Sequence, residues 1–105
     1  STAYNYSLGG SIVDPRLNLL QITPIAPMNT TAFRCFTSSI VLPPDLEIHI
    51  VPDYEYDRGA LVVVDGMEYD YAELARMTID LAPAEIRLVR LQHYDFWNKV
   101  KTKFL

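Results

Sequence analysis

Few groups of residues in this sequence have the types and spacing that chemistry needs. The run Asp53-x-Glu55-x-Asp57 is similar to a calcium-binding loop, but Val64 stands where such a loop places its bidentate glutamate. The two histidines lie forty-four residues apart, and with one cysteine in the chain they form no metal-binding spacing. No Ser-His-Asp triad can be identified either, because the order of these residues in the sequence does not define one. Residue types and spacing alone therefore predict neither a metal site nor a catalytic residue.

Two short helices are predicted, one near each end of the chain. Thr2 can cap a helix over residues 3–8, and the pair Gly9-Gly10 follows this helix and ends it, so it is no phosphate-binding loop. Asp95 can cap a second helix over residues 96–105. Its apolar stripe must dock on another surface, either the chain's own sheet or a partner. That stripe consists of Phe96, Trp97, Val100 and Phe104.

Between these helices the pattern favours strands. Alternating or short apolar runs separated by proline-rich corners are typical of an antiparallel sheet. The dipeptide Asp65-Gly66 between two such runs predicts a tight hairpin turn. We therefore predict one mainly β domain over residues 1–105, an antiparallel β-sandwich with a short N-terminal helix and a C-terminal helix. The predicted strands are residues 17–23, 32–36, 38–42, 46–51, 60–64, 67–71 and 84–91.

Composition and charge exclude some classes of partner. The net charge is −4, and eleven acidic residues lie between positions 45 and 85 with only two arginines among them. Because an acidic surface repels phosphates, nucleic acid is not expected as a partner. No apolar run approaches the ~20 residues of a membrane span, so no membrane association is predicted. The single cysteine fits a reducing compartment, and we expect the cytoplasm.

Three segments of the sequence carry a resemblance. The stretch STAYNYSLGGSIVDP, followed by ITPIAP and later by VVVDGM, resembles the C-terminal domain of the bacterial-type NAD kinases. In that family a serine-threonine-alanine-tyrosine motif leads into a helix, two glycines and a strand, and a Thr-Pro-Ile-x-Pro segment and an Asp-Gly turn follow in this order. The resemblance covers essentially all 105 residues.

The resemblance implies a group of substrate contacts in the first helix. Thr2 would offer a hydroxyl to the adenine edge of NAD, and Tyr4 an aromatic face with a polar tip. Ala3 and Asn5 would line the site, and Ser7 would add a second hydroxyl one helical turn beyond Tyr4. Without the resemblance, the same residues are explained as a helix cap and packing residues.

Two further contacts are implied later in the chain. Ala26 matches a position whose backbone meets the nicotinamide end of a dinucleotide, often across a subunit boundary. Asp65 matches the aspartate of an Asp-Gly-Gln turn, although Met67 replaces the glutamine here and Asp-Gly is also a common hairpin turn.

The activity that the resemblance implies is phosphorylation of the adenosine-ribose 2′-hydroxyl of NAD to give NADP. ATP or polyphosphate would be the donor, with Mg²⁺ or another divalent cation bridging its phosphates. The family's catalytic base lies in a GGDGT loop of an N-terminal α/β domain, and this chain contains no such loop. We expect the chain to be the C-terminal part of such an enzyme, inactive alone, with residues 94–105 packing on the N-terminal domain.

Homo-oligomers, dimers or tetramers, are also expected, because the family assembles through its β domains. Two alternatives remain open at this stage. One is the C-terminal domain of a related lipid or diacylglycerol kinase, and the other is a β-sandwich binding module without catalysis.

Overall fold

A computed structural model describes residues 2–53 and 59–105 of the chain. The chain forms two compact units, one of Ser1–Pro44 with Ala82–Leu105 and one of Asp45–Leu81. The run Asp53-x-Glu55-x-Asp57, which is not predicted to bind calcium, falls largely outside the described residues, since positions 55 and 57 are among those not described.

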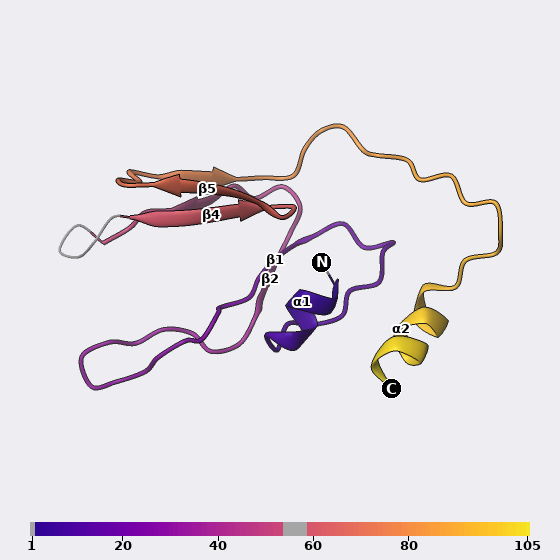
Figure 1. The fold of residues 1–105 in the computed structure, drawn as a ribbon, viewed down its shortest axis with the longest axis horizontal. Helices are drawn as coiled ribbons and strands as arrows, with labels where there is room; N and C mark the ends of the chain where they lie inside the picture. The colour runs from indigo at the N-terminus through magenta and orange to yellow at the C-terminus, as the bar shows by residue number, and fades with distance from the viewer. Residues whose placement is uncertain (1, 54–58) are drawn as a thin grey trace. The chain divides into compact units, whose positions relative to one another are not determined.

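The first unit contains both helices and one pair of strands (Figure 1). Strand β1 (Leu20–Ile22) pairs antiparallel with β2 (Ile40–Leu42), and Gln21 lies opposite Val41. Helix α1 (Thr2–Ser7) precedes this pair in the chain, and α2 (Phe96–Phe104) is the last element of the chain. The short apolar runs predicted as strands thus contain the paired residues, although the pairing extends over only three residues of each.

Helix α1 ends as the glycine pair predicts. Gly9 has a positive φ of 87°, which a glycine adopts without the strain of a Cβ. Its N–H donates to the carbonyl of Tyr6, and the Gly10 N–H donates to the carbonyl of Asn5. These two bonds satisfy the last carbonyls of the helix and form a Schellman motif. The start of the helix differs from the prediction, because Thr2 is itself helical and does not precede the helix as its cap.

Helix α2 begins at its predicted cap. The Asp95 backbone is extended, and its carboxylate accepts a hydrogen bond from the backbone N–H of Asn98 at 3.1 Å. This bond satisfies one of the free N–H groups of the first turn. At the other end, Lys101 and Lys103 lie in the last turn, where positive charge interacts favourably with the helix dipole.

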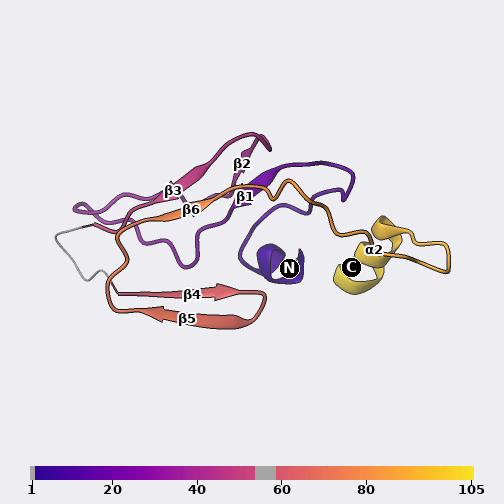
Figure 2. The ribbon, with the colours of Figure 1, turned by 90° about the horizontal axis from the view of Figure 1, so that it is seen from above.

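Within its described residues, 45–53 and 59–81, the second unit contains four strands in two antiparallel pairs (Figure 2). Strand β3 (Ile48–Ile50) pairs with β6 (Met77–Ile79), and β4 (Ala60–Val64) forms a hairpin with β5 (Met67–Tyr71). At the hairpin turn Asp65 and Gly66 both have positive φ, 49° and 82°. This is the geometry that a primed turn requires, so the Asp-Gly hairpin is confirmed.

The predicted class is confirmed: the chain is mainly antiparallel β, with a short helix near each end. Packing of the pairs into a sandwich remains a prediction. Strand β6 was missed because three residues with little alternation give no periodic signal.

Two predicted strands are wrong. In residues 32–36 local side chains take the N–H groups that a strand would pair: Thr30 Oγ1 accepts from Phe33, and Asn29 Oδ1 accepts from Cys35. Residues 84–91 also form no strand, since no described strand pairs with them. Their apolar side chains are exposed, with Ile86 at 92% and Leu91 at 95%.

Candidate functional site

Helix α1 brings five of the predicted site residues together. Thr2, Ala3, Tyr4, Asn5 and Ser7 all lie on this one helix, two turns long at most. The Tyr4 side chain is 58% exposed. Ser7 lies one turn further along, and its hydroxyl donates a hydrogen bond of 2.7 Å to the Tyr4 carbonyl. The helix therefore presents an aromatic ring and a hydroxyl next to each other on its surface.

Asn5 holds this helix against strand β1. Its amide nitrogen donates to the Ser11 carbonyl at 2.9 Å and to Gln21 Oε1 at 2.8 Å, and its amide oxygen accepts from the Thr23 hydroxyl at 2.6 Å. Both donors and the acceptor of the amide are thus used within the chain. Asn5 lies in the predicted site, and its bonds position the helix that carries the other residues.

Gly10 is the counterpart of Asn5 in this arrangement. It is the one residue of the described chain that is buried, and a Cβ placed on it would overlap the Asn5 side-chain amide. Glycine is required here by the close approach of a side chain, whereas Gly9 is required by its backbone conformation. The glycine pair therefore has two separate functions in fixing α1.

We call the hydrogen bonds from the Asn5 amide to Ser11, Gln21 and Thr23 the Asn5 clamp. A cavity of about 270 Å³ lies beside it. It is lined by Thr2 and Asn5 of α1, by Ser11 and by Gln21, together with apolar residues that precede β1. The Gln21 amide oxygen also accepts from the Ser11 backbone N–H at 3.0 Å. Thr2 thus lies at the wall of a hollow in which the other polar lining residues, Asn5, Ser11 and Gln21, are already hydrogen-bonded to one another.

Ala26 belongs to the same unit and lies four residues beyond the end of β1. Its φ is +47°, a left-handed conformation that costs a residue with a Cβ about 1–2 kcal/mol. Strain of this kind persists where the surrounding structure enforces it, and it is concentrated at functional sites. The positive φ of Ala26 therefore favours a functional contact made by its main chain.

Asp65 lies in the second unit, at the turn between β4 and β5. The structure gives it a local role, as the first residue of the primed turn, and Met67 begins the following strand. It is not brought together with the α1 residues within one unit.

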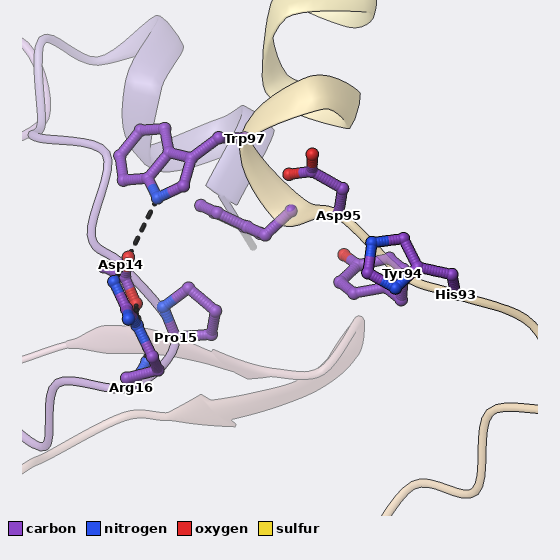
Figure 3. A pocket seen from close by; sticks show the side chains of 8 residues that line it. Asp14, Pro15, Arg16, His93, Tyr94, Asp95 and Trp97 are labelled. Atoms are coloured by element: carbon purple, nitrogen blue, oxygen red, sulfur yellow. Dashed lines mark hydrogen bonds and ion pairs between the residues drawn. The ribbon is translucent and has the colours of Figure 1, made fainter.

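Sequence reasoning missed a second polar centre, which ties helix α2 to the loop before β1 (Figure 3). The indole N–H of Trp97 donates to Asp14 Oδ2 at 2.8 Å, and Arg16 donates to both carboxylate oxygens at 2.9 Å. The two partners Asp14 and Trp97 are 83 positions apart. The available signal was the Asp14-Pro15 pair, which favours a turn, but it does not predict a distant indole.

These contacts set the protonation of Asp14. The hydrogen bonds from the Arg16 side chain and backbone, followed by the bond from Trp97, hold the pKa of the carboxyl well below its usual range. The same ion pair raises the pKa of Arg16. A cavity of about 410 Å³ adjoins this centre, lined by residues 14–16 and 93–97.

The low pKa of Asp14 predicts a pH dependence. An aspartate whose folded pKa lies below its unfolded value of about 3.9 stabilises the fold fully above that value. This stabilisation is lost as the pH falls from about 4 toward the folded pKa. We expect Asp14→Asn to lower the free energy of unfolding at pH 7. Below about pH 4 this difference from the unmodified chain should shrink, because the carboxyl of the unfolded chain is then protonated. Urea unfolding followed by the emission of Trp97, the one tryptophan of the chain, measures it from pH 7 to 2.

Asp80→Asn is the matched control, because it removes the same charge in the other unit. An equal loss of stability in that variant, or a stability difference that persists unchanged to pH 2, would contradict the assigned role of Asp14.

The ends of the chain also meet through apolar contacts. The rings of Tyr6 in α1 and Phe104 in α2 lie with their centroids 5.0 Å apart. Phe96, Val100 and Phe104 are half-buried, whereas Trp97 remains 48% exposed. Part of the predicted stripe of α2 thus docks on the chain's own first helix.

In residues 2–53 and 59–105, no helix has the length and apolar character needed to cross a bilayer. Over the same ranges, no group of three or more histidine, cysteine, aspartate or glutamate side chains is placed to hold a metal ion.

Comparison with known proteins identifies the family. The family described as ATP-NAD kinase C-terminal domain matches residues 1–91. The chain is 39% identical over 105 residues to the NAD kinase of Lactobacillus johnsonii and 41% identical to that of Lactobacillus delbrueckii subsp. bulgaricus. It is 36% identical over 109 residues to the NAD kinase of Streptococcus pneumoniae. All of this chain is covered in each case, but it spans only 38–39% of the relatives' length. The chain belongs to the family of ATP-NAD kinase C-terminal domains.

Proposed function

We propose that this chain is the substrate-binding C-terminal part of an NAD kinase, which transfers a phosphoryl group to the adenosine-ribose 2′-hydroxyl of NAD. The observation that carries the proposal is helix α1. Its residues belong to the matched family region, and the Asn5 clamp holds the helix with Tyr4 and Ser7 at the surface. A rigidly held helix that exposes an aromatic ring beside hydroxyl groups suits a nucleoside, which both stacks and hydrogen-bonds.

In this proposal the binding residues have distinct roles. Thr2 and Tyr4 meet the adenine, Ser7 adds a hydroxyl, and Ala3 lines the site. The strained backbone of Ala26 supports a contact made by its main chain. Asp65 is proposed as a further substrate contact, at the turn between β4 and β5. Because such transfer depends on positioning and on neutralising charge, these residues hold the substrate and the proton acceptor is assigned to another domain.

ATP or polyphosphate is the proposed donor, with Mg²⁺ or another divalent cation on its phosphates.

An exposed apolar segment of the chain supports the proposal that further protein surfaces pack on it. Ile86, Leu88, Val89 and Leu91 are 74–95% exposed, more apolar surface in one segment than a free-standing domain usually shows. We propose that residues 94–105 and their surroundings pack on an N-terminal kinase domain, and that copies assemble into a dimer or tetramer. The cytoplasm is the proposed location.

A chimera tests this function. The 105 aligned residues of the Lactobacillus johnsonii NAD kinase are replaced by this chain, and NADP formation is measured for the chimera and for the chain alone. We expect the chimera to retain kcat/KM within about 100-fold of the parent, the loss that a misplacement of about 1 Å causes. The chain alone should form no NADP, because catalysis needs the whole set of positioned groups.

NADP formation by the isolated chain would place the catalytic groups within these 105 residues and contradict the proposal. So would a folded chimera that neither binds NAD nor phosphorylates it. The parent with its own segment restored serves as the positive control.

A further inference from the structure

The first and last helices share a second cavity, of about 170 Å³. On one side it is lined by Thr2 and Ala3 of α1, and on the other by Lys99 and Lys103 of α2. The ring contact between Tyr6 and Phe104 joins the same two helices. The cavity therefore lies between a helix of the proposed substrate site and a basic helix to which the proposed function assigns no substrate contact.

The charged residues in the lining of this cavity are two lysines, which lie among mainly apolar and aromatic side chains. Lys99 and Lys103 are four residues apart on α2, so their side chains lie on one face, about 5–6 Å apart at Cβ. No carboxylate lines the cavity. The ion pairs recorded within the described residues involve other side chains, Arg16 with Asp14 and His49 with Glu47. Two lysines on one face of α2, in a cavity lining without a carboxylate, favour an anion beside them.

The positive charge continues beyond the cavity. Tyr94 contacts two cations: Arg90 Cζ lies 3.4 Å and Lys99 Nζ 4.9 Å from its ring centroid. Arg90, Tyr94 and Lys99 line an adjacent cavity of about 470 Å³. Lys103, Lys99 and Arg90 thus form a row that starts beside Thr2 and runs across two neighbouring cavities. A ligand with several linked negative groups can contact all three cations of this row, whereas a single small anion can contact only some of them.

We propose that Arg90, Lys99 and Lys103 bind a chain of linked phosphates that begins next to Thr2. The ligand class is a diphosphate or longer phosphate chain, and this identity rests on the proposed function of the neighbouring α1 residues. Two sources have this chemistry, the diphosphate of the dinucleotide and the phosphate chain of the donor. All but Glu85 of the eleven acidic residues between positions 45 and 85 belong to the other unit, whereas the basic end of the chain belongs to the first unit.

The direct test titrates inorganic diphosphate into the 105-residue chain by calorimetry. Lys99→Gln with Lys103→Gln should weaken its binding by about tenfold or more, since charge-assisted hydrogen bonds are lost. Lys101→Gln is the matched control, because it removes the same charge from the same helix but lines neither cavity. Binding that Lys101→Gln weakens as much as the double variant does, or that the double variant leaves unchanged, would overturn the proposal.

Lys99→Arg with Lys103→Arg separates charge from folding. It should retain diphosphate affinity within about threefold, because it keeps both charges, and circular dichroism should show the same helix content in every variant. Loss of binding in this arginine variant with the fold intact would also overturn the proposal.

The chimera then distinguishes the two sources. If the row holds the donor, Lys99→Gln with Lys103→Gln raises KM for ATP and leaves KM for NAD unchanged, and if it holds the dinucleotide the reverse occurs. Either result supports the site. An inactive chimera would contradict the proposed function, whereas diphosphate binding to the chain alone would still decide whether the cationic site exists.

Discussion

A methyl group added at Gly10 is expected to displace the Asn5 amide and to lower the stability of the chimera by about 2–4 kcal/mol, because three hydrogen bonds of that amide are lost together. The end of a flexible side chain can often move aside at little cost. Asn5 cannot do so here without leaving Ser11, Gln21 and Thr23 unpaired. KM for NAD should rise as well, since α1 loses its attachment to β1.

Gly9→Ala is the matched control for this change. A Cβ at Gly9 meets nothing within 4 Å, so its cost is limited to the left-handed backbone, about 1–2 kcal/mol. The double variant Asn5→Ala with Gly10→Ala should be hardly less stable than Asn5→Ala alone, because the amide that would clash is gone. Urea unfolding midpoints and KM for NAD measure both effects. Equal effects of Gly9→Ala and Gly10→Ala, or simple additivity in the double variant, would contradict the clamp.

Features fixed by local chemistry were predicted well from the sequence. The glycine pair after α1, the Asp65-Gly66 turn and the Asp95 cap each depend on residues within one turn of the chain. Such motifs carry their own geometric requirement, so the residue types alone predict them. The mainly antiparallel class followed from the sum of these signals.

Features that depend on distant partners were not predictable in this way. Residues 84–91 have strand-like composition, but without a pairing strand among the described residues the composition produces no strand. The bond between Asp14 and Trp97 joins residues 83 positions apart. The clamp of Asn5 on Gln21 and Thr23 is likewise non-local. Periodicity describes a face of one element and does not say which other element it meets.

The same division holds for the candidate site. The motif in α1 predicts which side chains belong to the site, and the structure shows the hydrogen bonds that hold their helix in place. Asn5 serves as the anchor of the helix, and the φ of +47° at Ala26 marks a backbone position that composition could not reveal. Lys99 and Lys103 of α2 are candidates for ligand binding because they line a cavity together with Thr2, which the sequence of α2 alone does not indicate.

The largest effect on substrate binding is expected at Tyr4. In the chimera, Tyr4→Ala should weaken NAD binding by about 1–3 kcal/mol, or about 5- to 150-fold in Kd, because an aromatic platform for the adenine is removed. Tyr4→Phe keeps the ring and should retain most of the affinity, which separates stacking from the hydroxyl. The unfolding midpoint should hardly change, since the side chain is 58% exposed.

Tyr6→Ala is the control for Tyr4, because it removes the same ring from the same helix. Tyr6 packs against Phe104, so its loss should lower stability through the contact between α1 and α2. Calorimetric titration of NAD and thermal unfolding distinguish the two tyrosines. If Tyr4→Ala left NAD affinity unchanged, or lowered stability as much as Tyr6→Ala, Tyr4 would be a packing residue and the adenine would have to bind elsewhere.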